Sequence, residues 1–147
     1  MDVITYKYST RQTVYAIVLF SGLIIFSYYQ IETGDASDVL WKIMVPFTLL
    51  FGVCLVYICY KYLRPLVRGE KVLELDGYKL YYAIADLTVY WKDVASISYT
   101  TGSRSTSWSI RFFMKDGSKT RTITTLYIAG SDASIYNTVI RYFEKYK

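Results

Sequence analysis

The sequence predicts a membrane α-helical hairpin joined to an α+β domain, in which a bent antiparallel sheet is followed by one C-terminal helix. Two observations predict the hairpin: residues 12–31 and residues 43–60 contain no charged side chain. A third predicts the domain, because the long apolar runs give way after residue 60 to short alternating segments. The chain of 147 residues is 53% hydrophobic, and the excess lies in its first 60 positions.

Both apolar runs are long enough to cross a membrane. At about 1.5 Å per helical residue, the 20 residues of the first run reach roughly 30 Å, the thickness of a bilayer's hydrocarbon core. The second run has 18 residues between Lys42 and Lys61, whose side chains can reach the two interfaces. A cleaved signal peptide is disfavoured, because the first run is too long and no small-x-small cleavage site follows it. We expect the hairpin over residues 12–62, with helices at about 12–31 and 42–61 and an outer loop at 32–41.

Charge predicts how the hairpin is oriented. Residues 61–147 contain fourteen basic and eight acidic side chains, whereas the outer loop holds three acidic side chains and no basic one. Loops rich in Lys and Arg stay in the cytoplasm. We therefore expect both chain ends on the cytoplasmic side, with residues 1–11 as an N-terminal segment and residues 63–70 as a basic linker to a domain over 71–147.

The hairpin contains small residues but no reactive site. Cys54 and Cys59 lie on different helix faces, and the chain has no histidine to complete a metal site with them. The absence of charged residues within the two runs argues against a transporter or a proton relay. Ser21, Gly22 and Gly52 would let another helix approach closely, so they are candidate helix-packing positions.

Alternating apolar residues and turn signals predict the sheet. Strands are expected at 71–75, 78–83, 87–91, 94–101, 108–114 and 119–126. Asp-Gly pairs at 76–77 and 116–117 predict tight hairpin turns, the second of which would pair Phe112 with Arg121. In residues 94–101, simple alternation puts Val94, Ser96 and Ser98 on one face.

The last segment predicts an amphipathic helix. Ser131 or Asp132 is expected to cap its N-terminus. Its apolar face is predicted from helical spacing to contain Ile135, Val139, Ile140 and Phe143. A meander of antiparallel strands closed by one helix is the layout of a pleckstrin-homology-like (PH-like) roll, in which the helix covers one open end of the sheet.

The segments VLELDGYKL, LTVYWKDVASISY and SIRFFMKDGSK follow the hairpin and precede the closing helix. In this order the sequence resembles small bacterial membrane proteins with two N-terminal spans and a PH-like domain, grouped as the Salmonella STM-type DUF proteins. The resemblance implies a PH-like module tethered to the bacterial inner (plasma) membrane, and it implies no catalytic activity. Trp91 and Asp93 are interpreted as a corner between strands.

The residues themselves favour no enzyme, cofactor or metal. The soluble part has neither histidine nor cysteine, the chain lacks a Gly-rich phosphate loop, and the carboxylates are scattered. The remaining candidates are basic residues around the second turn, which could form one positive patch that contacts an anionic headgroup or a partner: Arg104, Arg111, Lys115, Lys119 and Arg121. The alternative is that they only keep a small β domain soluble.

Three functions stay open from the sequence. The first is a membrane-tethered adaptor that binds a protein through a sheet edge or loop. The second is an immunity protein that neutralises a membrane-acting secreted toxin, and the third is a sensor of anionic lipids. The expected partners are membrane lipids and another protein, such as a toxin or a membrane protein. Nucleic acid is not expected, because the aromatic residues do not interleave with basic ones.

Overall fold

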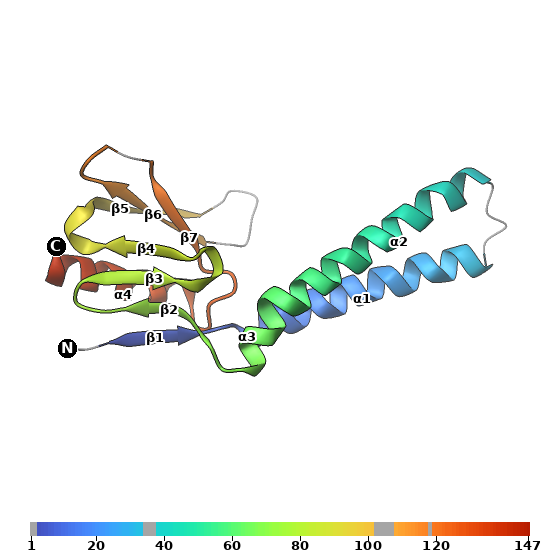
Figure 1. Ribbon diagram of the computed structural model, residues 1–147, viewed down its shortest axis with the longest axis horizontal. Coiled ribbons are helices and arrows are strands. Elements are labelled where there is room, and N and C mark those ends of the chain that lie inside the picture. The colour runs from blue at the N-terminus through green and yellow to red at the C-terminus, as the bar shows by residue number, and fades with distance from the viewer. Residues whose placement is uncertain (1–2, 34–37, 102–107, 118) are drawn as a thin grey trace. The chain divides into compact units, whose positions relative to one another are not determined.

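The computed structural model describes residues 3–33, 38–101, 108–117 and 119–147 (Figure 1). The chain divides into two compact units. Thr10–Arg68 form a helical hairpin, and the residues up to Ser9 and from Gly69 onwards form a β domain. The hairpin is therefore an insertion in the sequence of the domain. This agrees with the predicted hairpin and α+β domain but changes where the domain begins.

Two long helices form the hairpin. The stretches Thr10–Glu32 and Lys42–Val67 are each long and apolar enough to cross a membrane. The second helix extends beyond residue 61, because a π-helical turn precedes Pro65 and accommodates its missing N–H. It ends at Val67, and Gly69, two residues later, has a φ of 67°, a conformation that glycine adopts without strain. The elements are α1 (Thr10–Thr33), α2 (Asp38–Ile58), the π-helical turn (Cys59–Leu63) and α3 (Arg64–Val67).

The seam between α1 and α2 follows a seven-residue spacing. Thr13 and Ser27 of α1 are buried, and Phe20 lies midway between them in sequence. The Phe20 ring meets the Phe51 ring of α2 edge to face, with 6.3 Å between centroids, and Ile58 is buried one heptad further along α2. This spacing is typical of helices that pack side by side over a long distance, as Figure 1 shows.

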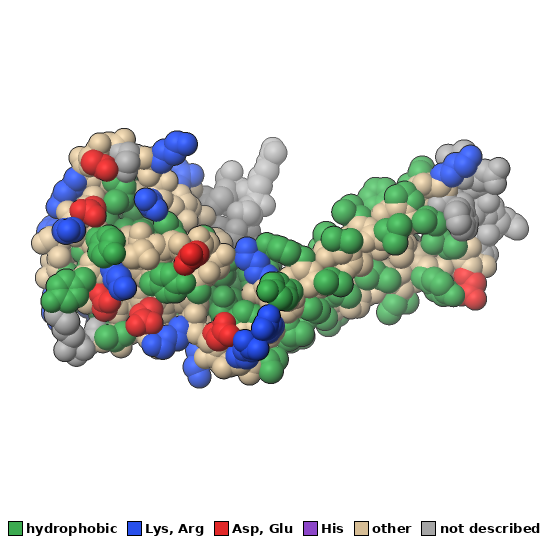
Figure 2. All heavy atoms as spheres, viewed as in Figure 1, with side chains coloured by type: hydrophobic (Ala, Val, Ile, Leu, Met, Phe, Trp, Pro, Cys, Tyr) green, Lys and Arg blue, Asp and Glu red, His purple; other side chains and the backbone are tan. Residues whose placement is uncertain are grey.

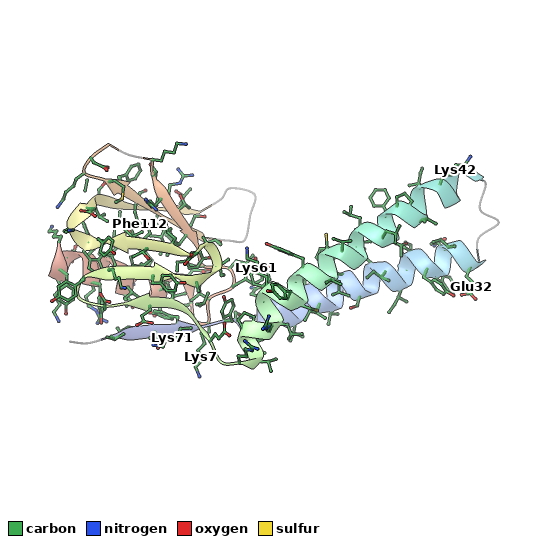
Figure 3. The ribbon with its side chains drawn as sticks, in the orientation of Figure 1. Lys7, Glu32, Lys42, Lys61, Lys71 and Phe112 are labelled. Atoms are coloured by element: carbon green, nitrogen blue, oxygen red, sulfur yellow. The ribbon has the colours of Figure 1, made fainter. Side chains whose placement is uncertain are left out.

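The outer surface of the hairpin is apolar between its two ends. Val18, Leu49 and Val56 are among the exposed side chains, with 64%, 67% and 70% of their surface accessible. Figure 2 shows the apolar band, and Figure 3 places Glu32 and Lys42 at the end of the hairpin far from Lys61. Such a surface is stable in contact with lipid chains and unfavourable in water.

Two antiparallel sheets and one helix form the β domain. Strand order is β1-β2-β3-β4 in the first sheet and β5-β6-β7 in the second. A corner of 3₁₀ helix at Trp91–Asp93 joins the sheets, as expected from the sequence. The strands are β1 (Ile4–Lys7), β2 (Lys71–Leu75), β3 (Lys79–Tyr82), β4 (Leu87–Tyr90), β5 (Val94–Thr101), β6 (Trp108–Met114) and β7 (Arg121–Thr124), and the helix is α4 (Asp132–Tyr146).

Strand β1 is the main departure from the sequence prediction, which places residues 1–11 outside the domain. Ile4 pairs with Leu75 and Tyr6 with Leu73, and the next residue but one, Tyr8, forms a bridge with Ile128 and is 6% exposed. Figure 3 shows Lys7 of β1 beside β2. The sequence alone does not reveal so short a strand beside a long apolar helix, because the strand that pairs with it lies beyond the whole hairpin.

The two Asp-Gly turns differ from each other. The second pairs Phe112 with Arg121 as predicted. The first is wider than predicted, since Leu75 pairs with Leu80. There the Asp76 carboxylate accepts the backbone N–H groups of residues 78 and 79, at 2.7 and 2.8 Å. By accepting these two hydrogen bonds, the Asp76 side chain stabilises the wider loop, so a tight two-residue turn is not needed there.

A β-bulge in β5 changes which side chains face the core. The register with β6 shifts between Val94 and Ser96, so Ala95 is the extra residue. Val94 is therefore buried, whereas Ser96 is exposed, and the predicted alternation, which put both on one face, is wrong. A period of two in the sequence cannot reveal a bulge, because the bulge inserts one residue into that period.

The core lies between the sheets and under α4. Ser131 is the N-cap of α4, since its hydroxyl accepts the Ser134 N–H at 3.2 Å. Tyr142 is buried while Ile140 is only half-buried, which differs from the predicted apolar face. The Tyr82 hydroxyl donates to the Thr124 carbonyl oxygen at 3.0 Å and so joins the two sheets. The largest fully buried side chains are Trp91, Phe112, Leu73, Leu75, Leu80, Ile110, Ile123 and Ile135.

Candidate functional site

Three carboxylates of the β domain make structural contacts. Asp76 holds the first turn, Asp86 accepts the Tyr81 hydroxyl at 3.0 Å, and Asp132 accepts the hydroxyl of Thr125. No cluster of metal-ligating side chains occurs among the described residues.

Two tyrosines of the domain have altered acidity. The hydrogen bond to Asp86, together with burial and the negative charge, raises the pKa of Tyr81. Burial, with contributions from Asp132 and Tyr136, raises the pKa of Tyr99. Both hydroxyls therefore keep their protons at neutral pH and do not act as bases.

The structure divides the predicted basic patch. Arg111 of β6 and Thr122 of β7 are cross-strand partners on the outer face of the second sheet. Arg121 is opposite the buried Phe112 and so lies on the opposite face, at the rim of the core. Lys115 is exposed beyond the end of β6, and Arg104 lies outside the described residues. One continuous patch is therefore not formed by the four described residues.

Lys119 and Arg121 line a groove of about 590 Å³. The opposite wall comes from Ala85 and Leu87, at the start of β4. The groove is thus bordered by the outer strands of the two sheets. It combines two cationic side chains with apolar and threonine side chains.

Strand β5 is the longest edge strand among the described strands. The edge strands are β1 and β4 in the first sheet and β5 and β7 in the second. Strands β1, β4 and β7 have only four residues each, whereas β5 has eight. Strand β5 also has no charged residue, proline or glycine, the features that normally protect an edge from pairing. The edge of β1 is partly occupied, because its Lys7 carbonyl accepts the Ala129 N–H at 2.8 Å. Among the described strands, β5 is thus the best template for an additional strand.

Hydroxyl side chains surround Arg111 on the outer face of β5, β6 and β7. Arg111 lies between Ser98 of β5 and Thr122 of β7 in one cross-strand row. The neighbouring row contains Thr100, Ser109 and Thr124. Apart from Phe113, which pairs with Ser96 and is 41% exposed, these outer-face side chains are polar, and Arg111 places a positive charge among them.

An aromatic pair borders β5 on the other side. The rings of Tyr99 and of Tyr136, which belongs to α4, lie 4.7 Å apart between centroids at an angle of 33°. Both side chains are half-buried. A strand laid along β5 would therefore meet hydroxyl groups on one face and aromatic rings on the other.

No family model, curated protein or solved structure matches the chain. The candidate site therefore rests on its geometry alone.

The predicted helix-packing positions of the hairpin lie in open surroundings. A Cβ atom added to Gly22 or Gly52 would meet nothing within 4 Å, and Gly52 lines an apolar groove of about 380 Å³ on α2. Ser21 is half-buried. These glycines are not needed for close packing of α1 on α2, which depends on residues with heptad spacing such as Phe20. They stay candidate contacts for a helix outside the hairpin.

Sequence reasoning missed the residues of the β5 edge. The sequence pattern identifies Ser98 and Tyr99 only as strand residues, and it does not single out Tyr136. One signal was present: an uncharged strand of eight residues between the corner at Trp91–Asp93 and a polar loop. Its meaning depends on knowing that β5 is an edge, which follows from the strand order and not from the strand itself.

Proposed function

We propose that this protein is a non-enzymatic adaptor, anchored in the bacterial inner membrane, whose PH-like domain binds another protein by accepting a strand at β5. The observation that carries the proposal is the long, uncharged, open edge of β5. Adding a strand there would satisfy its outward N–H and C=O groups, and side chains on both faces would select the partner.

The arrangement of strands supports the PH-like part of the proposal. A four-stranded meander, a three-stranded meander and a C-terminal helix occur in that order. The four-stranded sheet requires β1, which the sequence prediction had left out. The proposal includes the resemblance to small bacterial membrane proteins with two N-terminal spans and a PH-like domain.

The pairing of β1 with β2 supports the proposed topology. These strands lie on either side of the hairpin in sequence, and only Tyr8 and Ser9 separate β1 from α1. Since β1 and β2 are neighbours in one folded domain, the proposed topology places the start of α1 and the end of α3 on the same side of the membrane. The basic residues near these ends, such as Lys61 and Arg64, favour the cytoplasm.

The division of the basic residues favours protein binding over lipid sensing. A sensor of anionic lipids needs several cations that reach one surface together. Here Arg111 and Arg121 lie on opposite faces of the same sheet. No contact in the described residues specifically favours an immunity function, so we do not propose it.

Photo-crosslinking of the full-length protein in cells tests the adaptor function. A benzophenone amino acid is placed at Ser98 on β5, and in a second variant at Thr122, which flanks the same Arg111 from β7. We expect one recurring protein adduct from position 98 that position 122 does not give. Identical adducts from both positions, or no protein adduct from either, would rule out β5 as the binding edge.

A further inference from the structure

The chemistry of the partner strand follows from the row that contains Ser98, Arg111 and Thr122. Arg111 is exposed, and its guanidinium forms no ion pair with a described residue. The rows formed by Ser96 with Phe113, by Ser98 with Arg111, and by Thr100 with Ser109 contain no Asp or Glu. An unneutralised cation on a hydroxyl-lined face attracts an anionic group.

We propose that the strand bound at β5 carries a carboxylate beside Ser98 and an apolar side chain at the adjacent position. This inference rests on the proposed function and specifies its partner. Neighbouring strands are about 4.8 Å apart, so the added strand would lie about 10 Å from β6, two strand spacings away. Glutamate and arginine side chains that extend toward each other bridge such a distance. The Ser98 hydroxyl, which lies between them, donates a hydrogen bond to the same carboxylate.

The apolar position follows from the opposite face of β5. Side chains alternate between faces along a strand, so the residue next to the carboxylate points toward Tyr99 and Tyr136. Their rings form a half-buried aromatic surface. An aliphatic or aromatic side chain loses contact with water there, whereas a charged one would lose its hydration. The partner segment is therefore extended, with acidic and apolar residues in alternation.

Charge complementarity favours such a segment over a second copy of this chain. In a pair of copies joined through β5, each strand would offer only the residues VASISYTT, which contain no carboxylate. Arg111 would then stay without a counter-charge in both copies. An acidic segment of another protein supplies that charge.

Binding of designed peptides to the full-length protein in nanodiscs tests the inference. The probes are capped, fluorescently labelled octapeptides of alternating glutamate and valine, glutamine and valine, or lysine and valine, and fluorescence anisotropy gives their affinities. We expect the glutamate peptide to bind at least tenfold more tightly than the others. Arg111→Gln should weaken it about tenfold, as expected for one charge-assisted contact. Lys119→Gln, which removes the same charge from the groove on the other side of β7, should change it less than twofold.

The other outcomes separate this inference from the proposed function. If the glutamate and glutamine peptides bound equally well and both slowed amide hydrogen exchange in β5, the need for a carboxylate would be overturned. Strand addition at β5 would still hold. Tighter binding of the lysine peptide, or no effect of Arg111→Gln, would also overturn the acidic preference. Binding of none of the peptides would contradict both proposals. An adduct from position 98 that joins two copies of the chain would identify a second copy as the occupant.

Discussion

Residues 69–147 alone are expected to be unstable, whereas the same residues preceded by β1 should fold. To make the protein that keeps β1, called the linked domain below, a short Gly-Asn linker replaces the hairpin and joins Ser9 to Gly69. The connection is short because Lys7 pairs with Lys71 in the register of β1 and β2. The linker thus turns two paired strands into an ordinary β-hairpin.

The expected difference is large because β1 contributes core residues as well as backbone pairing. Tyr8, just after β1, is 6% exposed, and Ile4 and Tyr6 are half-buried. At about 1.5–3 kcal/mol for a fully buried large apolar side chain, and less for half-buried ones, their loss amounts to about 3–5 kcal/mol. That is a large part of the 5–15 kcal/mol by which native domains are usually stable.

Urea unfolding followed by circular dichroism measures this difference. The linked domain should show one cooperative transition, and residues 69–147 alone should show a much lower midpoint or none. A matched control replaces Tyr6 by proline within the linked domain, which disrupts β1 without shortening the chain. Equal midpoints with and without β1 would show that the strand is dispensable.

Trp91→Ala is expected to destabilise the β domain by about 3–5 kcal/mol, the usual cost of removing a large buried aromatic side chain. Trp91 is fully buried at the corner between the sheets, and its indole N–H donates to the Asp76 carbonyl oxygen at 2.8 Å. Its backbone N–H donates to the Tyr78 carbonyl oxygen at 3.1 Å. The side chain therefore ties the first turn of the domain to the corner between β4 and β5.

Tyr90→Ala provides the matched control for this substitution. Tyr90 is the preceding residue, but 46% of its surface is exposed. Its removal should change the free energy of unfolding of the linked domain by about 1 kcal/mol or less. If Trp91→Ala cost no more than Tyr90→Ala in the same urea titration, the corner would not be part of the core.

The hairpin and most of the strands could be predicted because their signals are local. Charge-free runs of 20 and 18 residues identify helices without any knowledge of their neighbours. The bounds predicted for β5 and β6 agree with those observed, and Ser131 is one of the two predicted caps. In each of these cases the residues that decide the structure are close together in sequence.

The features that determine the candidate site are not local. Strand β1 is recognisable only by its pairing with β2, and the bulge at Ala95 only by the register with β6. Likewise, Arg111 and Arg121 are close in sequence along one hairpin, yet the pairing of Arg121 with Phe112 separates them onto opposite faces. The prediction of one basic patch groups residues that are near the turn in sequence and does not assign their faces, so it does not separate Arg111 from Arg121.

The central claim is that a partner pairs with the open edge of β5. Amide hydrogen exchange of the full-length protein in nanodiscs, with and without the glutamate–valine peptide, tests it most directly. Alternate amides of an edge strand point away from its sheet, so the peptide should slow exchange at every second residue of β5 and leave β4 and β7 unchanged. Protection at β4 or β7 instead of β5, or at no edge strand, would contradict the claim.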